Sequence, residues 1–238
     1  MKSLPPYSVI TDNDYFIAVN KMSGISVGGD RWDESKERLD KILERDFKIP
    51  KVYTVHRIDK ETSGLVIFAK DRETHRSLSI AFEHRQVTKK YTAIVHGRTA
   101  WKETVCDLAL VPNGNKKHMT IIDKYQGKES FTRFVCMFSA GNFSVLSAYP
   151  ETGRIHQIRV HLSALGHPVV CDDLYGKENP IKLSSFKRGW KGDPLDEKPL
   201  LARLGLHALE LTLPDGQTLT AQMPRDISAL IKQLEKLN

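Results

Sequence analysis

A polar segment that runs straight into an uninterrupted apolar one constrains the fold of this chain more than any other feature. Residues 65–69 read LVIFA, and such continuity is typical of a central strand that is covered on both faces. The preceding residues, 56–64, read HRIDKETSG and combine charged with turn-forming side chains. Because loops braced by a rigid strand commonly carry functional groups, we expect a functional loop at the start of a buried strand.

Elsewhere the sequence alternates between helical and strand-like spacing. Apolar stripes predict helices at residues 33–47, 71–84, 153–165 and 225–237. Stretches rich in β-branched and aromatic residues predict strands at residues 15–21, 90–96, 105–110, 117–122, 130–138 and 143–149. A hairpin is expected around residues 214–216, and a long surface loop at 177–203. The sum is an α+β fold with a mixed, largely antiparallel central sheet flanked by helices, in a single domain over residues 1–238.

Composition and charge narrow the class of protein. Apolar residues make up 40% of the chain and charged residues 27%, which excludes wholesale disorder. No apolar run approaches a membrane span, the N-terminus lacks the apolar core of a secretory signal, and the three cysteines are irregularly spaced. These features favour a cytoplasmic protein without a disulfide framework. A net charge of +7 favours an anionic partner, most often nucleic acid.

The candidate functional carboxylate in the polar segment is Asp59. It lies between Arg57 and Lys60, and nearby cations favour the ionised form of a carboxyl group. The residues alone leave other interpretations open, because an aspartate in such a segment often forms a turn, caps a helix or makes a surface ion pair.

A second polar stretch, residues 150–161, reads PETGRIHQIRVH. On a helix, Arg154, Gln157 and His161 would line up beside the apolar stripe, with Arg154 in the first turn. A guanidinium placed there can hold a carboxylate in a two-pronged ion pair, although a solvated basic face is the alternative. The spacing of the nearby histidines gives no matched pair on one helical face, so we expect no metal site from His156, His161 and His167.

Several blocks in register make the chain resemble the RluA-type RNA pseudouridine synthases. They are residues 56–59 and 62–65, residues 90–91 with Gly97, residues 152–159, Asp172 with residues 175–176, and residues 206–208. The resemblance implies the pseudouridine synthase catalytic fold and an isomerase that acts on uridines of structured ribosomal or transfer RNA. It also implies a monomer that needs neither a metal nor another cofactor.

The resemblance assigns three catalytic positions. Asp59 matches the essential aspartate, which either adds covalently to the substrate or deprotonates the ribose. Arg154 matches its ion-pair partner, and Tyr91 matches a tyrosine that stacks on the uracil and lies within reach of the C5 proton. From the residues alone, a core aromatic of a strand is the preferred interpretation of Tyr91, because it lies inside a β pattern.

The resemblance also assigns four substrate-binding positions. Arg57 matches a residue that fills the gap left by the flipped base, unless it only balances the charge of Asp59. The other three positions are His56, Thr62 and Leu206.

The chain departs from the family pattern at two positions. Met22 stands where relatives have a proline, and Cys171 stands where they have a glycine. We expect the first change to loosen a turn, and the second to affect the local backbone rather than the chemistry. The catalytic pattern starts near the first residue, so we expect no separate N-terminal RNA-binding domain.

Two rival functions remain open. An RNA-binding or assembly factor could keep the fold without the reaction, although intact Asp59, Tyr91 and Arg154 argue against it. An N-glycosidase or glycoside hydrolase would need a second carboxylate. Glu61 and Glu151 are available for that role, but their spacing does not indicate a pair.

Overall fold

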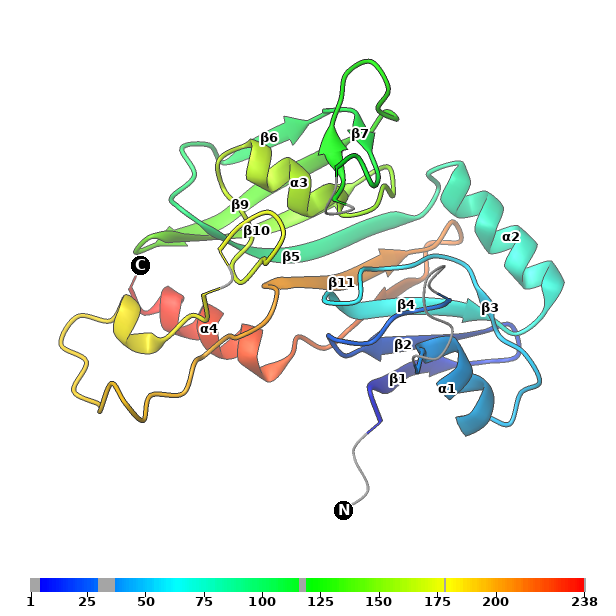
Figure 1. The fold of residues 1–238 in the computed structure, drawn as a ribbon. Helices are drawn as coiled ribbons and strands as arrows, with labels where there is room; N and C mark the ends of the chain where they lie inside the picture. The colour runs from blue at the N-terminus through cyan, green and yellow to red at the C-terminus, as the bar shows by residue number, and fades with distance from the viewer. Residues whose placement is uncertain (1–4, 30–36, 116–118, 178, 238) are drawn as a thin grey trace. The chain divides into compact units, whose positions relative to one another are not determined.

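The computed structural model describes residues 5–29, 37–115, 119–177 and 179–237 (Figure 1). It confirms the α+β class, with a largely antiparallel arrangement of strands flanked by helices. Contacts divide the chain into two compact units. Unit 1 comprises residues 1–89 and 208–222, and unit 2 comprises residues 90–207 and 223–238. Within the described ranges, no helix combines the length and apolar character needed to cross a bilayer.

Unit 1 is built on the apolar run that the sequence singles out. All seven residues of β4 (Ser63–Ala69) are buried, as expected for a central strand. Antiparallel pairing joins β4 to β2 (Phe16–Lys21) and to the short β3 (Tyr53–Thr54), and β2 in turn pairs with β1 (Tyr7–Asp12). The hairpin around 214–216 forms from β11 (Leu206–Thr212) and β12 (Thr218–Thr220).

Two helices complete unit 1. The helix α2 (Arg72–Glu83) starts where expected, because the Asp71 carboxylate caps it by accepting the Thr74 amide at 2.8 Å. Its residue Ala81 packs with β2 and β4. The helix α1 (Leu39–Asp46) covers only part of the predicted range 33–47, of which residues 33–36 lie outside the described part of the chain.

Unit 2 contains the strands β5 (Thr88–His96), β10 (Phe143–Pro150), β9 (Thr132–Ala140) and β6 (Glu103–Cys106) in that order. Ala93 and Leu146 pack with α3 (Gln157–Ala164), whereas their neighbours Ile94 and Val145 pack with α4 (Arg225–Glu235). Because side chains alternate along a strand, the two helices cover opposite faces of these strands (Figure 1).

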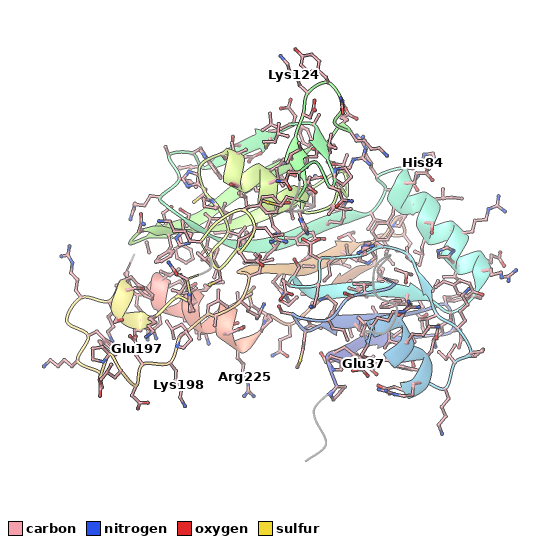
Figure 2. All side chains as sticks on the ribbon, in the orientation of Figure 1. Glu37, His84, Lys124, Glu197, Lys198 and Arg225 are labelled. Atoms are coloured by element: carbon pink, nitrogen blue, oxygen red, sulfur yellow. The ribbon has the colours of Figure 1, made fainter. Side chains whose placement is uncertain are left out.

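Smaller elements complete unit 2. The predicted strand 105–110 is interrupted, since β6 ends at Cys106 and β7 (Leu110–Val111) pairs instead with β8 (Ile121–Ile122). The predicted surface loop is largely irregular, with one short 3-10 helix, η1 (Leu183–Ser185). Glu197, which Figure 2 labels on this loop, binds Ser184 through its carboxylate.

The prediction of a helix over 153–165 was wrong at its start. The helix α3 begins only at Gln157, so Arg154 precedes the helix instead of occupying its first turn. His156 explains the difference, because its φ of 54° is left-handed and cannot belong to a right-handed helix.

Cys171, which stands where relatives carry a glycine, also has a left-handed φ, of 56°. Glycine adopts this conformation at no steric cost, whereas a residue with a side chain rarely does. Here the thiol is buried and lies 3.5 Å from the Asn179 carbonyl and 3.6 Å from the Leu201 carbonyl. Cys171 thus holds a left-handed backbone conformation, and the effect of the departure stays a prediction.

Candidate active site

Asp59 lies on an irregular loop between β3 and β4 of unit 1. Its side chain is half-buried, while the flanking Arg57 and Lys60 are exposed. Two buried neighbours, Ile58 and Thr62, anchor the loop, and the Thr62 amide donates to the Asp59 carbonyl at 3.1 Å. The loop is thus fixed on both sides of a partly exposed carboxylate.

Lys21 of β2 also braces this loop, and the sequence assigned it no role in the site. Its side chain is fully buried, and its ammonium donates at 2.9 Å to the carbonyls of Met22, Ile25 and Lys60. Three donors on the ammonium match three acceptors in number. The Lys60 carbonyl also accepts the Gly24 amide at 2.8 Å, so the residue after Asp59 is held by two separate groups. The available signal was a lysine that ends a strand whose first four residues, FIAV, are apolar.

His56 braces the other end of the loop. Its Nε2 accepts the Ile67 amide of β4 at 3.0 Å, and its ring stacks on Phe82 with centroids 4.6 Å apart. Burial lowers the pKa of His56 to about 3, and the Lys89 cation acts in the same direction. The ring is therefore neutral at pH 7, with its proton on Nδ1 because Nε2 is an acceptor.

The hydroxyl of Thr62 is enclosed. The residue is 1% exposed, and among the described residues no hydrogen-bond partner reaches its Oγ1. Unit 1 therefore brings together four of the residues that the resemblance assigns to the site: His56, Arg57, Asp59 and Thr62.

The other assigned residues, Tyr91, Arg154 and Leu206, lie in unit 2. Tyr91 is half-buried on β5, directly opposite Ala148 of β10, and it packs on the same apolar cluster as Leu206. Leu206 is itself only 3% exposed. The side chain of Tyr91 thus packs on the core and keeps some exposure, and its catalytic role stays a prediction.

Arg154 follows β10 in a turn that leads into α3. Its Nε donates at 3.0 Å to the Glu129 carbonyl, which uses one of the five N–H donors of the guanidinium. Its amide donates at 3.0 Å to Oε1 of Gln157. The sequence identified Gln157 as a neighbour of Arg154 on a shared helical face, but the contact runs through the backbone of a turn.

Arg159 of α3 takes part in a buried ion pair. Arg159 donates to the Asp172 carboxylate through Nε at 2.8 Å and through Nη2 at 2.7 Å, and both side chains are almost fully buried. Asp172 also accepts the amides of Leu174 and Tyr175. The pair fixes α3 to the segment that follows it.

The three histidines of this region each have a separate structural partner. His156 contacts the Tyr175 hydroxyl at 2.9 Å, His161 contacts Ser130 and Thr132 at 3.0 Å, and His167 contacts the His96 carbonyl at 3.0 Å. In the part of the chain that the structure describes, no group of three or more His, Cys, Asp or Glu side chains could hold a metal ion.

Comparisons with known proteins identify the family of this chain. The profile of a family described as RNA pseudouridylate synthase matches residues 15–164, which is more than half of the chain. The protein named dual-specificity RNA pseudouridine synthase RluA from Vibrio vulnificus (strain CMCP6) is 31% identical over 221 residues, covering 89% of this chain and 81% of that protein. Its namesake from Escherichia coli (strain K12) is 30% identical over 222 residues, covering 92% and 93%.

A solved structure shares the fold over the whole chain. It is named human RNA Pseudouridylate Synthase Domain Containing 1, with a TM-score of 0.67, 26% identity and coverage of 99% of this chain and 98% of that one. The family match and the bacterial relatives confirm the resemblance drawn from the sequence. The chain belongs to the RluA-type family of RNA pseudouridine synthases, enzymes that isomerise uridine in RNA.

Proposed function

We propose that this RNA pseudouridine synthase modifies specific uridines of ribosomal or transfer RNA, with Asp59 as the essential catalytic carboxylate. The observation that carries the assignment is the bracing of its loop. The Asp59 side chain is half-buried, and its backbone carbonyl accepts the Thr62 amide. The carbonyl of the next residue, Lys60, accepts both the Lys21 ammonium and the Gly24 amide. Such preorganisation suits a group that must meet a reacting atom.

The reaction is an isomerisation without net oxidation. The bond between ribose C1′ and uracil N1 breaks, the released base turns, and a bond forms between C1′ and C5. The proton on C5 then leaves, and N1 gains one. Asp59 drives the first step by adding covalently to the substrate or by deprotonating the ribose, and both routes need an ionised carboxylate. Since no electrons are gained or lost, the chemistry requires no redox cofactor.

Two residues of unit 2 serve the same reaction in this proposal. The Arg154 guanidinium stabilises the charge of the catalytic carboxylate, a role that suits a side chain whose Nε is already fixed on the Glu129 carbonyl. Tyr91 stacks on the uracil ring and assists removal of the C5 proton, while Leu206 supports it from the shared apolar cluster.

Access to the target requires that the uridine leaves its stack, which costs a few kcal/mol. Arg57 is exposed beside Asp59, and its planar guanidinium can stack and donate hydrogen bonds in the space that the base vacates. His56 and Thr62 support the substrate side of the same loop. An alternative role for Arg57 is to balance the charge of Asp59.

We also propose that the two units act as one catalytic domain, in a cytoplasmic monomer that needs no metal. The family profile supports a shared function, because residues 15–164 include parts of both units.

The test uses unmodified ribosomal and transfer RNA transcripts carrying tritium at C5 of uridine. Wild type should release tritium, and Asp59→Asn should reduce the rate by roughly a thousandfold or more. Glu61→Gln is the matched control on the same loop, and its rate should stay within a few-fold of wild type. Equal tritium release by Asp59→Asn would overturn the assignment of Asp59.

Other outcomes would favour the rival functions. Free uracil among the products, together with an inactive Glu61→Gln variant, would favour a glycosidase with two carboxylates. Tight RNA binding without tritium release from any transcript would favour an assembly factor. Mapping the pseudouridines lost when the gene is deleted would identify the RNA and the position.

A further inference from the structure

We propose that Gln157 is a positioning residue whose side-chain amide fixes the turn that presents Arg154. The inference rests on the proposed role of Arg154 and adds to it a residue that acts only through that arginine. Gln157 lies at the start of α3 in unit 2 and is 4% exposed, so RNA has almost no direct access to it.

The carboxamide of Gln157 uses its full hydrogen-bonding capacity. Its Oε1 accepts the Thr152 hydroxyl at 2.7 Å and the Arg154 amide at 3.0 Å. Its Nε2 donates at 2.9 Å to the Phe131 carbonyl and at 2.9 Å to the Thr132 hydroxyl. Two acceptor sites and two donors are all that a carboxamide offers. Because the site is buried, loss of the carboxamide would break four hydrogen bonds at once, among them the one to the Arg154 amide.

These contacts hold Arg154 from both sides of its backbone. The Arg154 amide donates to the Gln157 side chain, and the Arg154 carbonyl accepts the Gln157 amide at 3.2 Å, which closes a small ring. The guanidinium Nε is bound to the Glu129 carbonyl, and Gln157 is bound to the Phe131 carbonyl two residues further on. One side chain therefore sets the distance between the arginine backbone and the segment that holds its guanidinium.

The turn needs such a device because the local sequence favours a different conformation. Apolar spacing predicts a helix from residue 153, whereas the left-handed His156 delays the helix until Gln157. A contact of 2.9 Å between His156 Nδ1 and the Tyr175 hydroxyl supports this strained residue from the other side. Without the amide, we expect the turn to relax toward a longer α3, which would carry the Arg154 side chain to a new place.

The test is a double-mutant cycle in the tritium-release assay under single-turnover conditions with saturating enzyme. Gln157→Met keeps the length of the side chain and removes its hydrogen bonds. We expect it to lower the rate constant about 10- to 100-fold, since a small misplacement of a catalytic group can cost that much. RNA affinity should change less than about twofold. In an Arg154→Lys background, the same change should slow the reaction less than about twofold more.

Ser144→Ala is the matched control for a purely structural effect. Ser144 is also fully buried in unit 2 and bonds the Gly97 carbonyl, the Ser139 hydroxyl and the Thr99 amide, all away from Arg154. It should lower the free energy of unfolding while leaving the rate constant within about twofold of wild type. If Gln157→Met does not fold, Gln157→Glu carries the same cycle, because it keeps both acceptor positions and loses the donors.

The outcomes separate this inference from the proposed function. If Arg154→Lys is slow but the Gln157 variants react at the native rate, or if the two effects multiply, the positioning role is wrong and the role of Arg154 stands. If Arg154→Lys itself reacts at the native rate, the proposed role of Arg154 fails first. The inference is supported if Gln157→Met slows the reaction only when Arg154 is intact and Ser144→Ala leaves the rate unchanged.

Discussion

Each unit buries a cation close to a candidate catalytic segment, and the two cations are compensated in different ways. In unit 1, the ammonium of Lys21 meets three backbone carbonyls, one of which belongs to the residue after Asp59. In unit 2, the guanidinium of Arg159, five residues beyond Arg154, meets the Asp172 carboxylate in a bidentate pair.

The difference follows from the shapes of the two groups. A lysine ammonium is a compact charge with three rotatable donors, and it can gather carbonyls that point from several directions. The planar fork of arginine matches the two oxygens of one carboxylate. The Lys21 site therefore organises loop backbone, whereas the Arg159 site joins two side chains and cancels their charges. Consequently, a second substitution at Asp172 can compensate the loss of the Arg159 cation. The loss of Lys21 has no such remedy, because its ammonium binds backbone carbonyls.

The largest expected effect is at Arg159. Arg159→Met should lower the free energy of unfolding by about 3–5 kcal/mol, because it leaves the Asp172 carboxylate buried without its cation. Adding Asp172→Asn should recover part of this loss, since the uncompensated charge is removed while an acceptor remains for the Leu174 and Tyr175 amides. Urea unfolding of the two variants measures the difference. Losses that simply add would contradict the compensation.

A somewhat smaller loss is expected at Lys21. Lys21→Met should cost about 2–4 kcal/mol, because hydrogen bonds from a charged group are lost while the apolar stem is kept. The single-turnover rate should fall as well, because the Lys60 carbonyl beside Asp59 loses a partner. Lys41→Met, which changes an exposed lysine paired with Glu44 on α1, is the control and should stay within about 0.5 kcal/mol of wild type. Equal stabilities of the two variants would remove Lys21 from the bracing of the loop.

The pH dependence of stability gives a further contrast. The folded pKa of His56 is about 3, below its ordinary value of 6.5, so the unfolded chain takes up a proton first as the pH falls. Stability from this group is complete above about pH 6.5 and declines below it, by about 2 kcal/mol at pH 5. His56→Gln should lose less stability between pH 7 and pH 5 than wild type.

Two histidines of unit 2, His96 and His161, also have a pKa lowered by burial, and they remain in the His56→Gln variant. The variant should therefore keep part of the pH dependence. Urea unfolding at both pH values measures each contribution. If the variant lost as much stability between pH 7 and pH 5 as wild type, His56 would take up its proton without cost.

Replacing exposed cations should affect RNA binding and leave stability nearly unchanged, unlike replacing the buried ones. Lys187 and Arg188 are exposed on the surface loop of unit 2, so replacing both with glutamine should change stability by less than about 0.5 kcal/mol. If they contact phosphates, RNA affinity should fall a few-fold and the log–log salt slope should become shallower by about 1–2. An unchanged slope would exclude these two residues from the RNA-binding surface.

Features that depend on short stretches of sequence were predictable. The continuous apolar run of β4, the Asp71 cap of α2 and the hairpin of β11 and β12 follow from neighbouring residues, and the structure has all three. The blocks that carry the family resemblance likewise point to the segments of Asp59 and Arg154, because each block is a continuous stretch of chain.

The sequence by itself determined the fold class, the family and the segments that we propose for the reaction, because apolar periodicity and blocks of residues are properties of the local chain. Only the tertiary structure decided that Arg154 precedes α3 and that Lys21 and Gln157 hold the two segments in place. Lys21 meets a carbonyl 39 residues away, and Gln157 meets groups 25 and 26 residues away. Buried polar groups are satisfied by whatever folding brings near them, and no local spacing records those partners.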